Sequence, residues 1–108
     1  MWKVEYLPEA VSDLIRIDKS IRARIIKGIN KVVQNPVAKS HGGYGEPLGN
    51  QKGRDLSGLY KIKYRDIGIR VVYSLREQSG IMTIVVIGVR SNSEVYNEAY
   101  KRRIKHDI

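Results

Sequence analysis

The stretch from Leu59 to Leu75, LYKIKYRDIGIRVVYSL, predicts two antiparallel strands joined by a tight turn. Apolar and polar residues alternate on both sides of the turn, so each strand has one face suited to a protein core. The turn is expected around Asp66 and Ile67, where Gly68 is free to adopt a positive φ. The apolar faces are formed by Tyr60, Ile62 and Tyr64 on the first strand and by Ile69, Val71, Tyr73 and Leu75 on the second.

The polar face of this hairpin carries several cations. If Asp66 and Ile67 form the centre of an even-numbered loop, Lys63 lies directly across from Arg70, and Lys61 lies across from Val72. Like charges opposite each other destabilise a sheet, so this pair predicts a site that binds an anion. The inference depends on the register, because a slip of one residue would move the two cations to opposite faces.

Length and composition limit the class of protein. The chain has 108 residues, which is enough for one small domain spanning 1–108 with a single core. Hydrophobic residues make up 42% of it, which favours a folded globule over a disordered chain. It contains no cysteine, no apolar run long enough to span a membrane and no signal peptide. We therefore expect a soluble cytoplasmic protein without disulfides and without membrane contact.

The charge balance is the strongest global signal in the sequence. Lys and Arg number 20 against 11 Asp and Glu, which gives a formal net charge of +9. Such an excess of positive charge favours a polyanionic partner. That partner is either a nucleic acid or an acidic protein that covers the basic surface.

The segments around the hairpin predict three helices and two further strands. Trp2–Leu7 alternates as an opening strand, and Pro8 ends it. Helical spacing of apolar residues extends over Glu9–Asn35 and breaks at Asp18-Lys19-Ser20, with Ser20 as the candidate N-cap of a second helix. Ile81–Val89 predicts a buried strand, and a short terminal helix follows with Ser93 as its N-cap.

The segment Val37–Gly58 contains six glycines and little periodicity, and it is expected to form a long loop. The predicted order of elements is therefore β-α-α-β-β-β-α. This order indicates an α+β fold in which an antiparallel sheet packs against an N-terminal helical hairpin, with a short C-terminal helix.

A combined motif extends over residues 59–103. Tyr-Lys-x-Lys ends at Lys63, Arg70 follows it by seven residues, Arg90 ends the last strand, and Ser-Glu-Val-Tyr ends at Tyr96. In this motif the chain resembles the RelE-type toxins of bacterial type II toxin–antitoxin modules. The resemblance implies cleavage of mRNA in the ribosomal A site and neutralisation by an antitoxin protein. It also implies that the functional residues are Lys61, Lys63, Arg70, Arg90 and Tyr96.

The residue types fit RNA cleavage without a metal. The reaction needs a base for the 2′-OH proton, charge to stabilise the phosphorane and an acid for the 5′-oxygen. The sequence offers neither a plausible histidine pair nor an acidic cluster for Mg²⁺, so we expect no cofactor. A free lysine has a pKa of about 10.4, which crowding by Lys61 and Arg70 would lower at Lys63. Lys63 is therefore the candidate base, with Lys61 and Arg70 binding the phosphate oxygens.

Two residues keep alternative roles. Arg90 is either the general acid or a second charge stabiliser, and the stabiliser role is easier to defend because guanidinium releases a proton reluctantly. Tyr96 either stacks on an unpaired base or packs into the core. Further contacts to RNA or the ribosome are expected from cations outside this set, namely Lys52, Arg54, Lys101 and Arg102.

Two other classes of function remain open. The related ParE-type toxins share the fold but inhibit DNA gyrase by binding it, and they generally lack this set of Lys and Arg residues. A basic RNA-binding module without activity would also fit the charge. The expected partners are a cognate antitoxin, the ribosome and mRNA, and the antitoxin is expected to carry acidic residues.

Overall fold

The computed structural model describes residues 1–51, 53–89 and 92–108. It contains three helices, five strands and two short 3₁₀ turns: β1 (Lys3–Tyr6), α1 (Pro8–Ile15), α2 (Lys19–Val32), η1 (Lys39–His41), β2 (Glu46–Gln51), β3 (Arg54–Tyr64), η2 (Arg65–Ile67), β4 (Ile69–Arg76), β5 (Ile81–Gly88) and α3 (Asn92–His106). None of the helices in these ranges is long and apolar enough to cross a membrane.

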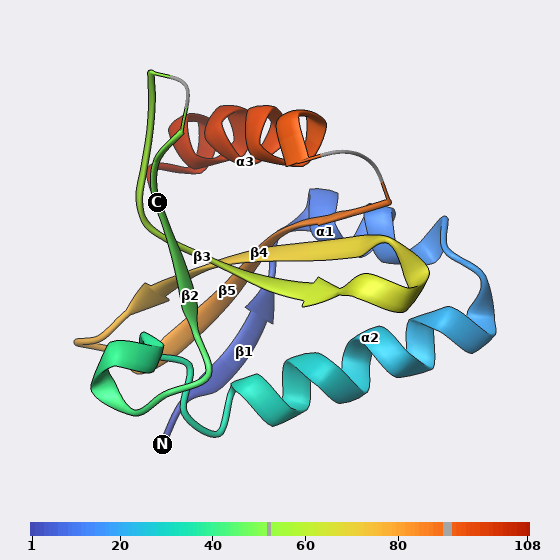
Figure 1. The fold of residues 1–108 in the computed structure, drawn as a ribbon, viewed down its shortest axis with the longest axis horizontal. Coiled ribbons are helices and arrows are strands. Elements are labelled where there is room, and N and C mark those ends of the chain that lie inside the picture. Colours follow the sequence, from blue (N-terminus) through green and yellow to red (C-terminus); the bar gives the residue numbers. More distant parts are fainter. Residues whose placement is uncertain (52, 90–91) are drawn as a thin grey trace.

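All five strands belong to one twisted sheet with the order β1-β5-β4-β3-β2 (Figure 1). The neighbours from β2 to β5 are antiparallel, whereas β1 runs parallel to β5. The predicted α+β class is confirmed, and the sheet is mixed rather than purely antiparallel.

The central hairpin has the predicted register. Lys63 pairs with Arg70 and Lys61 pairs with Val72 across β3 and β4. The connection is the η2 turn, and Gly68 ends it with φ 65°, a left-handed conformation that favours glycine. The side chains of Lys63 and Arg70, which lie opposite each other, are therefore on the same face of the sheet.

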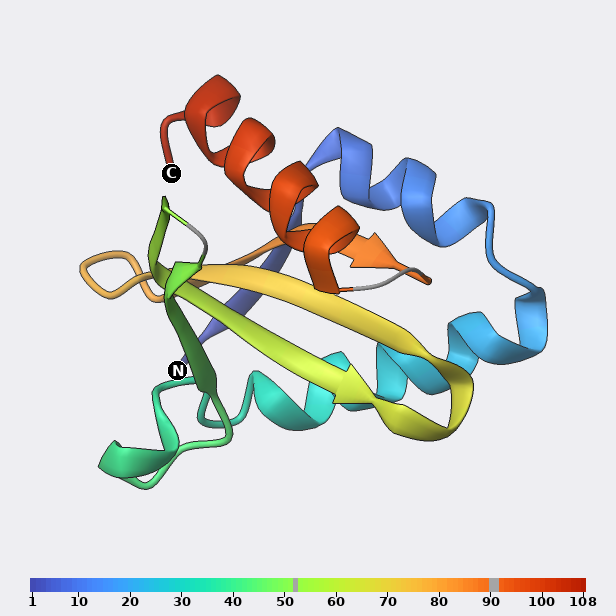
Figure 2. The same cartoon turned by 45° about the horizontal axis from the view of Figure 1, so that its top comes forward.

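The two faces of the sheet are covered by different helices (Figure 2). α2 crosses the face that carries the hairpin tyrosines, where the Tyr64 hydroxyl donates to the Ile25 carbonyl at 2.7 Å. Gly28 permits this approach, because a Cβ there would overlap the Tyr64 ring. α3 covers the opposite face, where Val95 packs close to Gly88 of β5. The Lys61 and Lys63 side chains alternate with the tyrosines and therefore lie on the α3 side.

α1 lies beside β5, beyond the point where β1 stops pairing with it. β1 pairs with β5 as far as Ile84, so the backbone N–H of Ile87 has no strand partner on that edge. The Asp13 carboxylate of α1 accepts this N–H at 3.1 Å. α1 thus lies beside β5 near the edge of the sheet, and α2 follows on the face that carries the tyrosines.

Two predicted helix caps were wrong. α2 begins at Lys19, two residues earlier than expected, and its N-cap is Asp18, whose carboxylate accepts the backbone N–H of Ser20 at 2.9 Å. An aspartate carries the negative charge that the positive end of a helix favours, so it outcompetes the serine. α3 begins at Asn92, which places Ser93 within its first turn rather than at the cap.

The prediction of a long loop over 37–58 was also wrong. Its first part forms the η1 turn, and its second part forms β2 and the start of β3. The pairing between β2 and β3 contains an irregularity between Pro47 and Gly49, which has φ 64°. Gly45 allows a tight approach as well, because a Cβ there would lie 2.6 Å from the Pro36 carbonyl oxygen. Gly45 and Gly49 are therefore needed for a compact edge of the sheet.

Candidate functional site

The cations of the hairpin form one cluster on the α3 side of the sheet. Lys61 and Lys63 come from β3, and Arg70 comes from β4 directly opposite Lys63. The proximity lowers the pKa of Lys63, chiefly because of the positive charge of Lys61. Arg65, in the turn that follows β3, contributes in the same direction. The predicted effect of Lys61 on Lys63 is therefore present, whereas Arg70 is not among the groups that shift this pKa.

Tyr96 of α3 lies next to the cluster. Its side chain is 5% exposed, and burial raises the pKa of its hydroxyl, while the nearby positive charges of Arg70 and Lys63 oppose that shift. Both the Tyr96 hydroxyl and Nε of Arg70 are buried, and within the described residues neither atom has a partner in good hydrogen-bond geometry, although Arg70 lies close enough to the Tyr96 hydroxyl to lower its pKa through a hydrogen-bond contact. An unpaired buried polar atom is destabilising by about 1–3 kcal/mol, so such atoms indicate a missing partner.

The burial of Tyr96 changes its expected role. Its ring packs in the core between α3 and the sheet, so the alternative of core packing holds and the ring face is not open for a nucleobase. The hydroxyl is the part of the side chain that lies near the cluster, since Arg70 and Lys63 act on its pKa. A ligand that accepts hydrogen bonds from both Arg70 and this hydroxyl would satisfy both unpaired atoms.

One carboxylate stands near the cluster without neutralising it. Glu46 of β2 pairs with Lys61 across the sheet, and its carboxylate accepts a hydrogen bond from Nζ of Lys39 at 3.0 Å. That hydrogen bond lowers the pKa of Glu46, and the charges of Lys61 and Lys63 add to the effect. Throughout the described part of the chain, no carboxylate forms an ion pair with Lys61, Lys63 or Arg70.

Sequence reasoning missed two residues of this surface. Arg65 continues the alternation of Lys61 and Lys63 by one more step, and that spacing was a usable signal. With Lys63 and Arg70 it lines a hollow of about 190 Å³ at the end of the hairpin. Glu46 lies in the segment expected to be a loop, so no local pattern placed it beside Lys61.

Of the other predicted contacts that the structure describes, Arg54 and Lys101 lie apart from the cluster. Arg54 begins β3, seven residues before Lys61, which separates the two by about 23 Å along the strand. Lys101 is exposed on α3. The predicted residues Lys52 and Arg90 lie outside the described part of the chain. The cluster is therefore built from Lys61, Lys63 and Arg70, with Arg65 and Tyr96 at its border.

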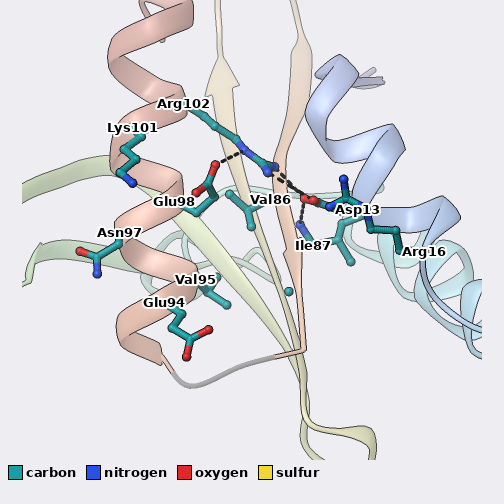
Figure 3. A pocket seen from close by; sticks show the side chains of 11 residues that line it. Asp13, Arg16, Val86, Ile87, Glu94, Val95, Asn97, Glu98, Lys101 and Arg102 are labelled. Atoms are coloured by element: carbon teal, nitrogen blue, oxygen red, sulfur yellow. Dashed lines mark hydrogen bonds and ion pairs between the residues drawn. The ribbon is translucent and has the colours of Figure 1, made fainter.

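Arg102 corrects the prediction of an RNA contact. Its side chain is buried, with Nη1 2.6 Å from Oδ2 of Asp13 and Nε 2.9 Å from Oε2 of Glu98 (Figure 3). Burial opposes its charge, but the hydrogen bonds to Asp13 and Glu98 raise the pKa of Arg102 above its ordinary value. These groups line one wall of a pocket of about 520 Å³ between α1 and α3. The charge of Arg102 is compensated by Asp13 and Glu98, so this residue has a structural role and is not available to bind RNA.

Comparison with known proteins gives the family. A family model described as the ParE toxin of the type II toxin–antitoxin system, parDE, matches residues 4–96. A putative RelE-like toxin protein of Escherichia coli is 31% identical over 101 residues, which cover 94% of this chain and 96% of that protein. The mRNA interferase toxin RelE of E. coli strain K12 is 26% identical over 99 residues, covering 92% of this chain and 94% of that protein.

A solved structure supports the same relationship at the level of the fold. A chain of the intact E. coli RelBE toxin–antitoxin complex has a TM-score of 0.66 and 17% sequence identity, over 85% of this chain and 100% of that chain. The sheet with its cationic hairpin thus occurs in a sequence that matches toxins along most of its length. The chain belongs to the RelE/ParE family of toxins from type II toxin–antitoxin systems.

Proposed function

We propose that this toxin is an endoribonuclease, a ribosome-dependent mRNA interferase that cleaves mRNA in the ribosomal A site by metal-free attack of a 2′-OH. The observation that carries the proposal is the cluster of Lys61, Lys63 and Arg70, which has no ion-pair partner among the described residues, with a buried Nε of Arg70 and a buried Tyr96 hydroxyl that lack a well-placed partner in the same part of the chain. A phosphodiester supplies the negative oxygens that these groups lack. The similarity to a protein named mRNA interferase supports the same reaction.

Each residue of the cluster takes a separate role in this reaction. Neutral Lys63 accepts the 2′-OH proton while the 2′-oxygen attacks phosphorus, and its lowered pKa increases the neutral fraction. Arg70 and Lys61 hold the equatorial oxygens of the phosphorane, and the Tyr96 hydroxyl donates to one of them. The bond from phosphorus to the 5′-oxygen then breaks, and that oxygen takes up a proton. The products are a 2′,3′-cyclic phosphate and a 5′-hydroxyl, and Arg90 remains the candidate for acid or charge stabiliser.

The same cluster suggests how the toxin is controlled. A cognate antitoxin with acidic residues would cover the cations, as the net charge of +9 favours. The solved relative RelBE is itself a toxin–antitoxin complex. Because exposed charges are screened by salt, we expect the affinity of antitoxin for toxin to fall as ionic strength rises. Binding that is insensitive to salt would contradict this electrostatic mechanism.

Mapping of mRNA ends tests the proposal directly. Induced expression of the wild-type toxin should arrest growth and create mRNA 5′ ends that are phased with codons. The Arg70→Ala and Lys63→Ala variants should lose both effects. The matched control is Lys27→Ala, which removes an exposed lysine of α2 on the other side of the sheet and should keep both effects. Cuts that persist in Arg70→Ala would contradict the assignment of the site.

The match to the ParE family model favours a second candidate, inhibition of DNA gyrase by binding. In that case, expression would arrest growth with intact mRNA and trapped complexes of gyrase with DNA. Expression without toxicity would instead indicate a basic RNA-binding module that does not cleave. The uncompensated cations on β3 and β4 argue for the nuclease, because a surface that only binds protein does not require a crowded lysine.

A further inference from the structure

Asp13 joins three elements of the fold that are far apart in the sequence. Its carboxylate lies on α1, accepts the backbone N–H of Ile87 in β5 at 3.1 Å and receives Nη1 of Arg102 in α3 at 2.6 Å (Figure 3). Nη2 of Arg102 reaches the second carboxylate oxygen at 3.2 Å. Nη1 also donates to the Val85 carbonyl at 2.9 Å, which fixes the guanidinium against the same strand.

This junction is buried and complete. The side chains of Asp13 and Arg102 are each 10% exposed, and Glu98 takes the Nε hydrogen of Arg102. The planar fork of an arginine fits a carboxylate in this two-pronged manner, which fixes orientation as well as distance. The junction therefore fixes where α3 lies and how it is rotated about its axis.

The rotation of α3 matters because its two flanks have different neighbours. Arg102 lies on the flank toward α1 and β5, whereas Tyr96 lies near Arg70 and Lys63 of the hairpin. Arg103 anchors α3 to β3 through the Asp55 carbonyl at 3.0 Å. A helix held from both sides cannot rotate without moving Tyr96.

The start of α3 also lies close to the sheet. A Cβ at Gly88 would be only 2.6 Å from Val95, the residue before Tyr96. Gly88 pairs with Arg70 in the sheet, so this contact is one strand away from the cluster. A small displacement of α3 would therefore change the distance between the Tyr96 hydroxyl and Arg70.

We infer that Asp13 and Arg102 are positioning residues for the cleavage site, which hold α3 so that the Tyr96 hydroxyl faces the phosphate bound by Arg70. This inference rests on the proposed ribonuclease function. Neither Asp13 nor Arg102 belongs to the cluster of Lys61, Lys63 and Arg70. The effect of this pair on cleavage passes through Tyr96 alone, and this separates it from a residue that only stabilises the fold.

A double-mutant cycle tests the coupling. Asp13→Asn keeps the shape of the side chain but weakens its interaction with Arg102. Because this change raises the barrier to cleavage, it should lower kcat about tenfold with little change in KM. In a Tyr96→Phe background, the same Asp13→Asn change should lower kcat less than twofold. Cleavage is measured at a temperature where every variant is folded. An equal loss in both backgrounds would overturn the inference.

The matched control is Glu98→Gln. Glu98 also bonds Arg102, but it belongs to the same helix and is half-exposed, so it does not connect α3 to α1. This variant should leave kcat within twofold of wild type. A loss as large as that of Asp13→Asn would show that any change around Arg102 disturbs the site, which would contradict a specific role for the link between helices.

A second measurement separates this inference from the proposed function. The Tyr96 ring is observed by NMR in toxin labelled with ¹³C-tyrosine and is assigned by comparison with Tyr96→Phe. In Asp13→Asn the pKa of Tyr96 should fall toward the ordinary tyrosine value, because the ring loses burial. It should stay unchanged in Glu98→Gln. An unchanged Tyr96 in Asp13→Asn overturns the inference even if no RNA is cut, whereas wild-type toxin that cuts no mRNA overturns only the proposed function.

Discussion

Two charged regions lie on the two flanks of α3, and they are built in opposite ways. The region around Arg102 has a carboxylate or carbonyl for each of its guanidinium nitrogens. The cluster around Arg70 has three cations without an ion pair and a buried Nε without a partner, as far as the described residues show. One arginine is compensated within the chain, whereas the other has no ion-pair partner among the residues that the structure describes.

This difference indicates which charges act in folding and which act in function. A charge buried with its partners contributes to the position of the elements that it connects, and removing one partner is strongly destabilising. A crowded set of cations is destabilising until an anion binds, and proteins retain such sets at functional sites. Variants in the two regions should therefore have opposite effects on stability and activity.

The largest effect is expected for Lys63→Met. Loss of a general base typically lowers the rate by about 10²–10⁴-fold. The free energy of unfolding should not decrease, since the variant removes a charge that its neighbours repel. Cleavage of mRNA on programmed ribosomes gives the rate, and urea unfolding gives the stability. Lys27→Met, on the far side of the sheet, serves as the control, and a loss of stability in Lys63→Met without loss of cleavage would reverse the comparison.

The compensated region should show the converse. Arg102→Met leaves Asp13 buried without its cation, which should lower the free energy of unfolding by roughly 3–5 kcal/mol. Combining it with Asp13→Asn should recover part of this loss, because no unpaired charge remains. Urea unfolding measures both. The control is Arg24→Met, which breaks an exposed ion pair with Asp66 and should change stability little. Equal losses in Arg102→Met and Arg24→Met would contradict the structural role.

Local sequence patterns were enough to predict the cluster but not the junction. Lys63 and Arg70 are only seven positions apart in the sequence, and their pairing follows from the turn between them. The ion pair between Asp13 and Arg102 spans 89 positions of sequence. In its own segment, Arg102 is one of several cations on a helix, and nothing local separates it from the exposed Lys101. Asp13 and Arg102 meet only because α1 and α3 both pack against β5.

The edge strand β2 was missed for a related reason. Glu46–Gln51 contains a proline and a glycine and shows no alternation, so its own residues do not favour a strand. β2 forms because the backbone of β3, from Arg54 onward, is available to pair with it. Strand pairing decided the conformation there, whereas intrinsic preference decided it in the hairpin. The parallel arrangement of β1 and β5 likewise depends on contacts that no segment encodes by itself.

A smaller effect separates the contributions to the pKa of Lys63. If neutral Lys63 is the base, the cleavage rate rises with pH until Lys63 is fully deprotonated. Lys61→Met removes the main charge that lowers this pKa, so the midpoint of the rise should move to higher pH. The rate also falls at every pH because Lys61 binds the phosphate, and therefore the midpoint is the diagnostic quantity. A midpoint that stays in place would exclude Lys63 as the titrating base.

The smallest effect, in the opposite direction, is expected for Glu46→Gln. The Glu46 carboxylate raises the pKa of Lys63, though less than Lys61 lowers it, so the variant should move the midpoint of the pH–rate profile to lower pH. Glu5→Gln, an exposed carboxylate of β1 at the other edge of the sheet, should leave the midpoint unchanged. Opposite shifts in Lys61→Met and Glu46→Gln would show that the base responds to the sign of its neighbours' charge. Shifts in the same direction would mean that both variants act by distorting β3, and the cluster would then be no more than a packed strand surface.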